Sequence, residues 1–279
     1  MTLRRPCGYV AFALAFGLAA ASCASLSPPR LDVNQSLRES SVPVTIAGGI
    51  LEIHLAQRVP PRANAPLVVF ASGDGGWFGA AVGMFETVAS AGYPVVGLSA
   101  RGLLRHLRTP GHPLTATHLL DAYAEIIASA RQALSLPAGG QVVLAGWSRG
   151  AAISVIVAAE RPVPAVAGIV AIGLAADENL NVDLESDDDA QGSSGGSIHG
   201  LNIYALSRSI PGRVAVVQSS GDGYLPAERA RVLFGANTDA RHFYQVPAAN
   251  HRFTGGETSF RQNLLDALGW MSITEESHQ

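Results

Sequence analysis

Residues Gln141–Gly150 read QVVLAGWSRG, and the stretch that follows, Ala151–Glu160, reads AAISVIVAAE. The run Gln141–Ala145 is typical of a strand buried on both faces, and the small apolar residues after Gly150 favour a helix. Between them, Gly146-Trp147-Ser148-Arg149-Gly150 matches the pattern G-x-S-x-G. A strand, a sharp turn that carries a serine and a helix together form a nucleophile elbow. A chance pentapeptide is the alternative, and the strand and helix around the motif argue against it.

Working outward from this stretch, strands and helices alternate along the chain. A hairpin is expected at Val42–Leu55 around Gly48-Gly49, since β-branched residues flank the glycines. Further strands are expected at 67–71, 93–98, 166–174, 213–218 and 241–246, and helices at 78–91, 115–134, 151–160, 225–234 and 259–271. This alternation predicts a mostly parallel sheet with helices on both faces, in one domain over residues 42–273. Together with the elbow, it indicates the α/β-hydrolase fold.

Composition excludes several other classes of protein. The chain has 279 residues, of which 48% are hydrophobic and 15% charged, so a disordered chain is excluded. Its net charge is −3, and no Arg-rich block is present, which argues against binding of nucleic acid. Both cysteines, Cys7 and Cys23, lie near the N-terminus, so the rest of the chain has no disulfide framework and no Cys-based zinc site.

The N-terminus has the layout of an export signal. Arg4 and Arg5 precede the apolar run Gly8–Ala21, which is shorter than the roughly 20 residues that span a bilayer. We expect a signal peptide over residues 1–23, a linker over 24–41, a tail over 274–279 and a periplasmic protein. The stretch that ends at Cys23 is similar to a lipobox, so Cys23 is either a lipid anchor or adjacent to an ordinary cleavage site.

A nucleophilic serine needs a base, and chain order selects His251. In α/β hydrolases this histidine follows the last strand, and His251 comes shortly after the strand expected at 241–246. The competitor His242 lies within that strand, where its side chain faces one side of the sheet. Asp222, after the strand expected at 213–218, is the expected acid that orients the histidine. Asp177 and Glu178, after the preceding strand, are the rival acids.

An oxyanion hole needs two backbone N–H donors. Arg149 supplies one as the residue after the nucleophile, and Asp74, with Gly75 next, supplies the other from the loop Ser72–Trp77 (SGDGGW). Gly75 and Trp77 are expected to contact substrate. Trp77, Phe78 and Leu103-Leu104 are either apolar walls of the substrate pocket or residues of the core. The loop has no nucleotide-binding pattern, and this chemistry requires no cofactor and no metal.

The loop SGDGGW, the segment Arg108-Thr109-Pro110 and the elbow GWSRG together resemble the family of the bacterial virulence protein VirJ and the acid-virulence protein AcvB. The likeness extends over about residues 66–253, and the elbow differs at Trp147 and Arg149, where the family more often has Tyr and Phe. The resemblance implies an exported α/β hydrolase with Ser148, Asp222 and His251 as its triad. It also implies an association with type IV secretion, and for the acid-virulence branch the hydrolysis of aminoacylated phosphatidylglycerol.

Two functions therefore remain open. The first is a serine hydrolase of the cell envelope that cleaves an ester or lipid substrate through an acyl-enzyme, at or near a membrane surface. The second is a non-catalytic periplasmic adaptor on a hydrolase scaffold, with secretion-system proteins as partners. The acidic stretch Asp183–Asp189 is either a solvated loop or a rim that attracts a cationic group.

Overall fold

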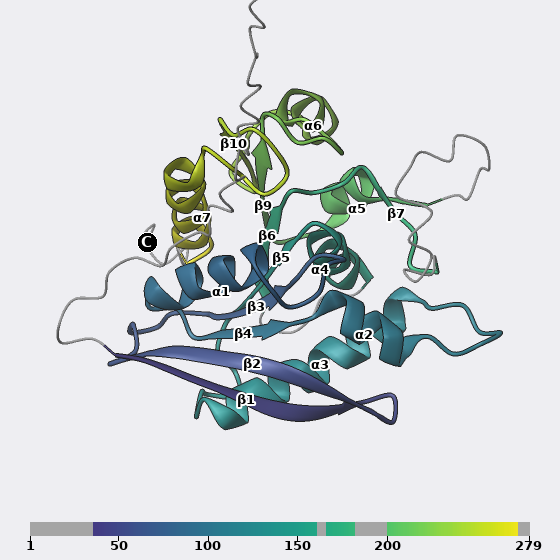
Figure 1. The fold of residues 1–279 in the computed structure, drawn as a ribbon, viewed down its shortest axis with the longest axis vertical. Helices are drawn as coiled ribbons and strands as arrows, with labels where there is room; N and C mark the ends of the chain where they lie inside the picture. Colours follow the sequence, from purple (N-terminus) through teal and green to yellow (C-terminus); the bar gives the residue numbers. More distant parts are fainter. Residues whose placement is uncertain (1–35, 161–165, 182–199, 273–279) are drawn as a thin grey trace, which may run out of the picture.

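A computed structural model describes residues 36–160, 166–181 and 200–272 (Figure 1). The expected signal peptide, linker residues 24–35, the acidic stretch Asp183–Asp189 and the tail 274–279 lie outside the described residues. The strands are β1 Ser36–Ile46, β2 Gly49–Val59, β3 Leu67–Ala71, β4 Val95–Leu98, β5 Val142–Trp147, β6 Val166–Ile172, β7 Asp177–Glu178, β8 Leu201–Asn202, β9 Arg213–Ser219 and β10 Arg241–Val246. The helices are α1 Ala80–Ser90, α2 Ala100–Leu107, α3 Ala116–Ala133, α4 Arg149–Glu160, α5 Ile203–Ser209, α6 Ala227–Phe234 and α7 Glu257–Met271.

A single sheet of eight strands forms the centre of the molecule, in the order β1-β2-β4-β3-β5-β6-β9-β10. The six strands from β4 to β10 in this order are mutually parallel, whereas β2 runs antiparallel to both β1 and β4. Because parallel strands end at the same edge, the loops that follow β3, β5, β6, β9 and β10 meet along one side of the sheet. The predicted mostly parallel sheet is confirmed.

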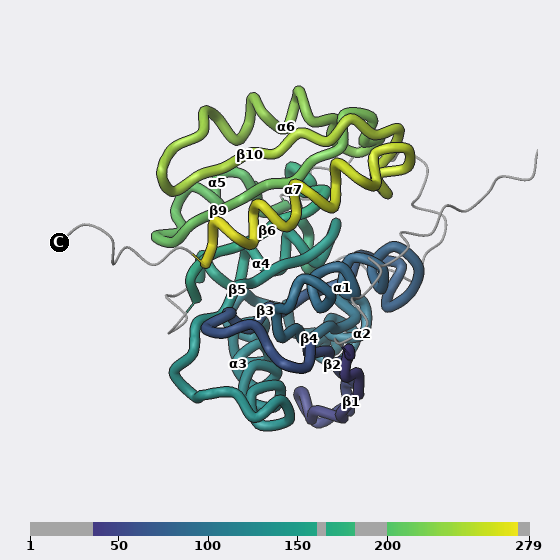
Figure 2. Tube along the Cα trace, turned by 90° about the vertical axis from the view of Figure 1, so that its left-hand side faces the viewer, coloured from purple at the N-terminus to yellow at the C-terminus, as the bar shows by residue number. Residues whose placement is uncertain are grey.

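Helices cover both faces of this sheet. Successive residues of β5 point to opposite faces, so Leu144 packs in one core cluster with α2 to α6, and Ala145 packs in the other with α1 and α7. Figure 1 and Figure 2 show α1 and α7 side by side on their face. The strand β3, LVVFA, is buried along its whole length, as a strand covered on both faces must be.

The edge hairpin is longer than the sequence predicts. Its turn at Ala47-Gly48 has positive φ at both residues, which suits a tight connection. However, β1 begins at Ser36, so residues 36–41, expected in the linker, pair with 54–59 of β2. Most of their side chains are exposed, and an exposed edge strand carries no apolar alternation that would distinguish it from a linker.

Two helices, α2 and α5, were not expected. The helix α2 begins where the Ser99 side chain accepts a hydrogen bond from the Gly102 N–H, a local capping contact at a strand end. Leu103 and Leu104 on α2 are fully buried, so of the two roles expected for them they belong to the core. In the described part of the chain, no helix is both long enough and apolar enough to cross a membrane.

Candidate active site

The motif G-x-S-x-G forms a strained turn between β5 and α4. Ser148 has φ of +57°, a left-handed conformation that is uncommon outside glycine, and its N–H donates to the Ile172 carbonyl at 2.8 Å. A Cβ on Gly146 would lie 2.3 Å from the Gly150 backbone, and one on Gly150 would lie 2.2 Å from the Ala71 carbonyl oxygen. Both glycines of the motif are therefore required by close backbone packing, as a nucleophile elbow demands.

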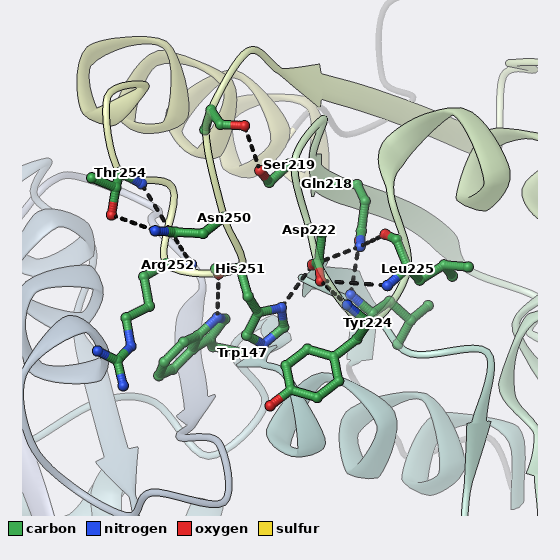
Figure 3. A network of polar contacts seen from close by, with 12 residues as sticks. Trp147, Gln218, Ser219, Asp222, Tyr224, Leu225, Asn250, His251, Arg252 and Thr254 are labelled. Carbon is green, nitrogen blue, oxygen red and sulfur yellow. Dashed lines mark hydrogen bonds and ion pairs between the residues drawn. The ribbon is translucent and has the colours of Figure 1, made fainter. Parts of the chain in front are cut away.

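Asp222 and His251 are joined by a short hydrogen bond. His251 Nδ1 lies 2.7 Å from Asp222 Oδ2, although the two residues are 29 positions apart in the chain (Figure 3). The Asp222 side chain is 1% exposed and that of His251 is 15% exposed. With the carboxylate as acceptor, Nδ1 carries the proton, which leaves Nε2 as the basic nitrogen.

The carboxylate of Asp222 is held by three further donors. Gln218 Nε2 donates to Oδ2 at 3.0 Å, and the N–H groups of Tyr224 and Leu225 donate to Oδ1 at 2.9 and 3.4 Å (Figure 3). Gln218 is fully buried, and it also donates to the Leu225 carbonyl. This orienting side chain was missed by the sequence analysis, since a glutamine inside an apolar strand carries no motif.

Aromatic rings enclose the imidazole of His251. The Trp147 ring stacks on one side with centroids 5.4 Å apart, and the Tyr224 ring meets it edge-on at 4.9 Å. The Trp147 Nε1–H donates to the His251 carbonyl at 3.2 Å, and this bond ties the elbow to the histidine loop (Figure 3). A Cβ on Gly173 would lie 2.8 Å from His251 Cε1, so the imidazole packs directly against the chain after β6.

The serine and the imidazole lie at the same edge of the sheet without a hydrogen bond between them. The Ser148 N–H is hydrogen-bonded to the Ile172 carbonyl, and the His251 ring packs against the next residue, Gly173. Within the described residues, His251 Nε2 is buried and has no hydrogen-bond partner. Catalytic hydrogen bonds are often long in a protein without substrate and tighten when substrate binds.

The glycine-rich loop after β3 lies against the elbow. A Cβ on Gly73 would lie 3.1 Å from the Ser148 Cβ, and one on Gly75 would lie 3.2 Å from the Phe78 ring, which is 62% exposed. Arg149 is the first residue of α4, so its N–H has no acceptor within the helix. The expected donors Arg149 and Asp74 therefore belong to two segments that meet beside Ser148.

The side chain of Arg149 has partners that the sequence analysis did not foresee. Its guanidinium bonds Glu178 through Nε at 2.9 Å, Asp74 through Nη1 at 3.0 Å and the Asn179 carbonyl through Nη2 at 3.1 Å. Burial lowers the pKa of Arg149, but the hydrogen bonds and charges of Glu178 and Asp74 raise it by more, so the guanidinium stays charged. Burial raises the pKa of the Glu178 carboxyl, and the hydrogen bond from Arg149 opposes that shift.

The side-chain contacts distinguish Asp222 from the rival acids Asp177 and Glu178, and His251 from the rival base His242. Glu178 pairs with Arg149, and Asp177 is exposed, whereas the carboxylate that bonds His251 belongs to Asp222. His242 stacks on Trp270 with ring centroids 4.0 Å apart, on a sheet face as expected for a residue within β10.

Trp77 does not lie where the sequence analysis placed it. Its ring stacks on His54 at 4.5 Å and meets Phe85 edge-on at 5.2 Å, and a Cβ on Gly97 would lie 1.9 Å from it. The ring thus fills the space over β2 and β4. It also lines an open cavity of about 340 Å³ beside β1, β2 and α1, away from the strands that carry Ser148, Asp222 and His251. The Trp77 ring is packed into the space beside Gly97, and this position does not support the expected contact with substrate.

Solved structures show which fold this arrangement belongs to. The chain is similar to a protein assigned as a dienelactone hydrolase from Klebsiella pneumoniae, with a TM-score of 0.61, 13% identity, and coverage of 86% of this chain and 100% of that one. It is also similar to Est1E from Butyrivibrio proteoclasticus, with a TM-score of 0.57, 16% identity and coverage of 82% and 99%. The esterase domain of a Rhodothermus marinus protein matches with a TM-score of 0.54, 17% identity and coverage of 85% and 98%.

Comparisons of sequence match a smaller part of the chain than the comparisons of structure do. No curated protein matches the chain. A family model does match, over residues 65–191, and its description is bacterial virulence protein (VirJ). The matched residues include the loop after β3 and the elbow, so the predicted resemblance is confirmed there: this chain is an α/β hydrolase by fold and VirJ-like over residues 65–191.

Proposed function

We propose that this protein is a serine hydrolase that cleaves an ester through an acyl-enzyme intermediate. The observation that carries the proposal is the buried Asp222–His251 hydrogen bond, formed at the sheet edge where Ser148 occupies a left-handed elbow. A strained serine, an orienting acid and a histidine, in this chain order, are the parts that acyl transfer requires in an α/β hydrolase. The hydrolase fold supports the proposal.

The first half of the reaction forms the acyl-enzyme. His251 Nε2 accepts the proton of the Ser148 hydroxyl as Oγ attacks the ester carbonyl carbon, and the carbonyl oxygen becomes an oxyanion. The N–H groups of Arg149 and Asp74 stabilise that oxyanion. Collapse breaks the bond to the leaving alcohol, which takes the proton from His251 and departs. Asp222 stabilises the imidazolium throughout.

The second half returns the enzyme to its starting state. A water molecule loses a proton to His251 Nε2 and attacks the acyl carbon. The second oxyanion occupies the same pair of N–H groups. Its collapse breaks the bond to Ser148 Oγ, which regains the proton from His251, and the carboxylic acid is released. Each proton thus passes through one nitrogen atom, Nε2 of His251.

For the substrate we propose an aminoacylated phosphatidylglycerol, hydrolysed in the periplasm at a membrane surface, with Cys23 as the lipid anchor. The choice of substrate rests on what the resemblance to the acid-virulence branch implies, since the description of the family model that matches residues 65–191 names no substrate. The export signal and the lipobox-like stretch rest on sequence alone. The exposed rings of Tyr224 and Phe78, next to His251 and to the glycine-rich loop, are suited to contact the apolar part of an ester.

The adaptor hypothesis is the second candidate, because the matching family is described as a virulence protein and not as an enzyme. A fluorophosphonate probe separates the two. The hydrolase predicts covalent labelling of the wild type, complete loss of labelling in Ser148→Ala and unchanged labelling in Ser135→Ala. Ser135 is a matched control, since it is also left-handed, with φ of +55°, and exposed, but lies outside the site.

Absence of an adduct on folded wild-type protein would favour the adaptor. Hydrolysis of aminoacyl-phosphatidylglycerol vesicles, compared with a short neutral ester, then tests the substrate. Ser148-dependent hydrolysis of the short ester alone would reject the lipid while keeping the mechanism.

A further inference from the structure

The buried guanidinium of Arg149 has no role in the reaction described above, which uses only the backbone of that residue. Its side chain is 8% exposed, as is that of Glu178, while Asp74 is 54% exposed. Keeping a charge buried is costly unless hydrogen bonds compensate it, so this placement calls for a reason.

The buried partners fix the orientation of the guanidinium. Nε and Nη2 both lie within hydrogen-bond distance of Glu178 Oε1, at 2.9 and 2.8 Å, and Nη2 also donates to the Asn179 carbonyl. Because the group is planar and rigid, fixing these two nitrogens also fixes the direction of Nη1. Nη1 then donates to Asp74 Oδ1 at 3.0 Å.

Asp74 lies in a loop whose start is held by neighbouring segments. The Ser72 N–H donates to the Leu98 carbonyl, and the Ser72 hydroxyl accepts from the Ala100 N–H. The Gly76 N–H donates to the Gly73 carbonyl and closes a turn with Asp74 and Gly75 at its centre, but this bond does not join the turn to the rest of the protein. The bond from Arg149 to the Asp74 carboxylate joins this glycine-rich turn to α4 and limits its conformational freedom.

We propose that the Arg149 side chain is a positioning residue for the oxyanion hole. Its bond to the Asp74 carboxylate holds the loop that carries the Asp74 N–H against α4, whose first residue supplies the Arg149 N–H. This inference rests on the proposed serine hydrolase function. Arg149 thus contributes one donor through its backbone and orients the other, on Asp74, through its side chain. Two carboxylates already neutralise the guanidinium, so it presents no net positive charge to an anionic substrate.

The test changes Asp74, because removing Arg149 would leave the buried Glu178 unpaired and could unfold the protein. Asp74→Ala keeps the backbone N–H and removes only the tie. Asp74→Asn removes the charge but keeps an oxygen that can accept from Nη1. Asp177→Ala is the matched control, since Asp177 is an exposed carboxylate next to Glu178 on β7.

Four quantities are measured on each variant: kcat and KM for a short neutral ester, the inhibition constant of a boronic acid, and the rate of fluorophosphonate labelling. A boronic acid forms a tetrahedral adduct with the serine and places an oxygen in the oxyanion hole, so its affinity reports transition-state binding. A residue that only stabilised the fold would change the melting temperature without changing these quantities in proportion.

We expect Asp74→Ala to lower kcat about tenfold with KM nearly unchanged, and to weaken boronic acid binding by a similar factor. The loss is smaller than the roughly 10²–10³ that follows removal of an oxyanion donor, since the N–H remains in the chain. Asp74→Asn should recover most of this loss, and Asp177→Ala should match the wild type.

Other outcomes overturn the proposal. Wild-type kcat and boronic acid affinity in Asp74→Ala would show that the loop needs no tie. An equal rise of KM in both Asp74 variants, with kcat unchanged, would assign the carboxylate to charge recognition instead. If wild-type protein lacks Ser148-dependent labelling, the hydrolase function and this inference both fail, whereas labelling that is equally fast in wild type and Asp74→Ala rejects this inference alone.

Discussion

Replacing Asp222 by asparagine tests the acid of the proposed triad with almost no change in the shape of the side chain. The N–H groups of Tyr224 and Leu225 donate to Oδ1, so the amide oxygen must occupy that position to keep both bonds. The amide nitrogen then replaces Oδ2, where it faces His251 Nδ1 at 2.7 Å and Gln218 Nε2 at 3.0 Å. The group that faces His251 Nδ1 has thus changed from a hydrogen-bond acceptor to a donor.

The tautomer of His251 must change in response. Facing an N–H donor, Nδ1 has to accept, so the imidazole proton moves to Nε2. A protonated Nε2 cannot take the proton of Ser148. In a serine protease with a Ser-His-Asp triad, an Asp→Asn change that keeps the geometry lowers kcat by about 10⁴. That factor corresponds to roughly 5.4 kcal/mol of lost transition-state stabilisation, at about 1.36 kcal/mol for each factor of ten.

The same change destabilises the fold modestly. Gln218 Nε2 loses the carboxylate oxygen and faces another donor, although it keeps its bond to the Leu225 carbonyl at 2.7 Å. Leaving one buried donor without this acceptor costs about 1–3 kcal/mol of unfolding free energy. The variant should therefore fold, with a lower melting temperature, and be nearly inactive.

The assay is kcat for a short ester, combined with ¹⁵N NMR of the histidine ring to identify the tautomer. Asp177→Asn serves as the control, because Asp177 was the rival acid and is exposed. If Asp222→Asn kept more than a tenth of wild-type kcat, Asp222 would not be the orienting acid. If activity fell while Nδ1 kept its proton, the tautomer argument would be wrong even though the residue matters.

The remaining predictions concern stability. Gly150→Ala should lower the unfolding free energy by about 3 kcal/mol or more, since the new Cβ would lie 2.2 Å from the Ala71 carbonyl oxygen. Gly269→Ala is the control: it has open space around it in α7, so this change should be neutral or should stabilise the fold by about 0.5–1 kcal/mol. Trp77→Leu should lower the melting temperature while kcat per folded molecule stays within about twofold, which a large loss of kcat would contradict. Burial raises the pKa of the half-buried Glu86 carboxyl above 4.5, so its ionised form disfavours the folded state. Glu86→Gln should accordingly raise the melting temperature at pH 7 but not well below pH 4.5, where Glu86 is protonated in both states; an equal gain at both pH values would refute this cause.

The parts of the site that sequence could predict are those whose cause is local. The glycines of G-x-S-x-G are fixed by contacts within the elbow and with the neighbouring strand β3, so the pattern itself carries the geometry. His251 and Asp222 could be selected because chain order and strand ends determine which loops meet at the edge of a parallel sheet.

What the sequence could not show are contacts between distant positions. Arg149 bonds Asp74, 75 positions away, and Glu178, 29 positions away, and neither spacing is a motif. Trp77 could not be placed either, because nothing local indicates that Gly97 leaves space for its ring. The strand residues 36–41 were missed for a related reason: they are ordered by pairing with β2, and most are exposed.

The two residues that flank Ser148 in the elbow show how such distant contacts complete the site. Trp147 donates from Nε1 to the His251 carbonyl, and Arg149 donates from Nη1 to Asp74. Trp147 thus joins the elbow to the loop that carries the proposed base, and Arg149 joins it to the loop that carries the proposed second oxyanion donor. These are the positions x of G-x-S-x-G, which the pattern leaves undefined. Substitutions there should therefore change the rate of catalysis without removing any group that reacts.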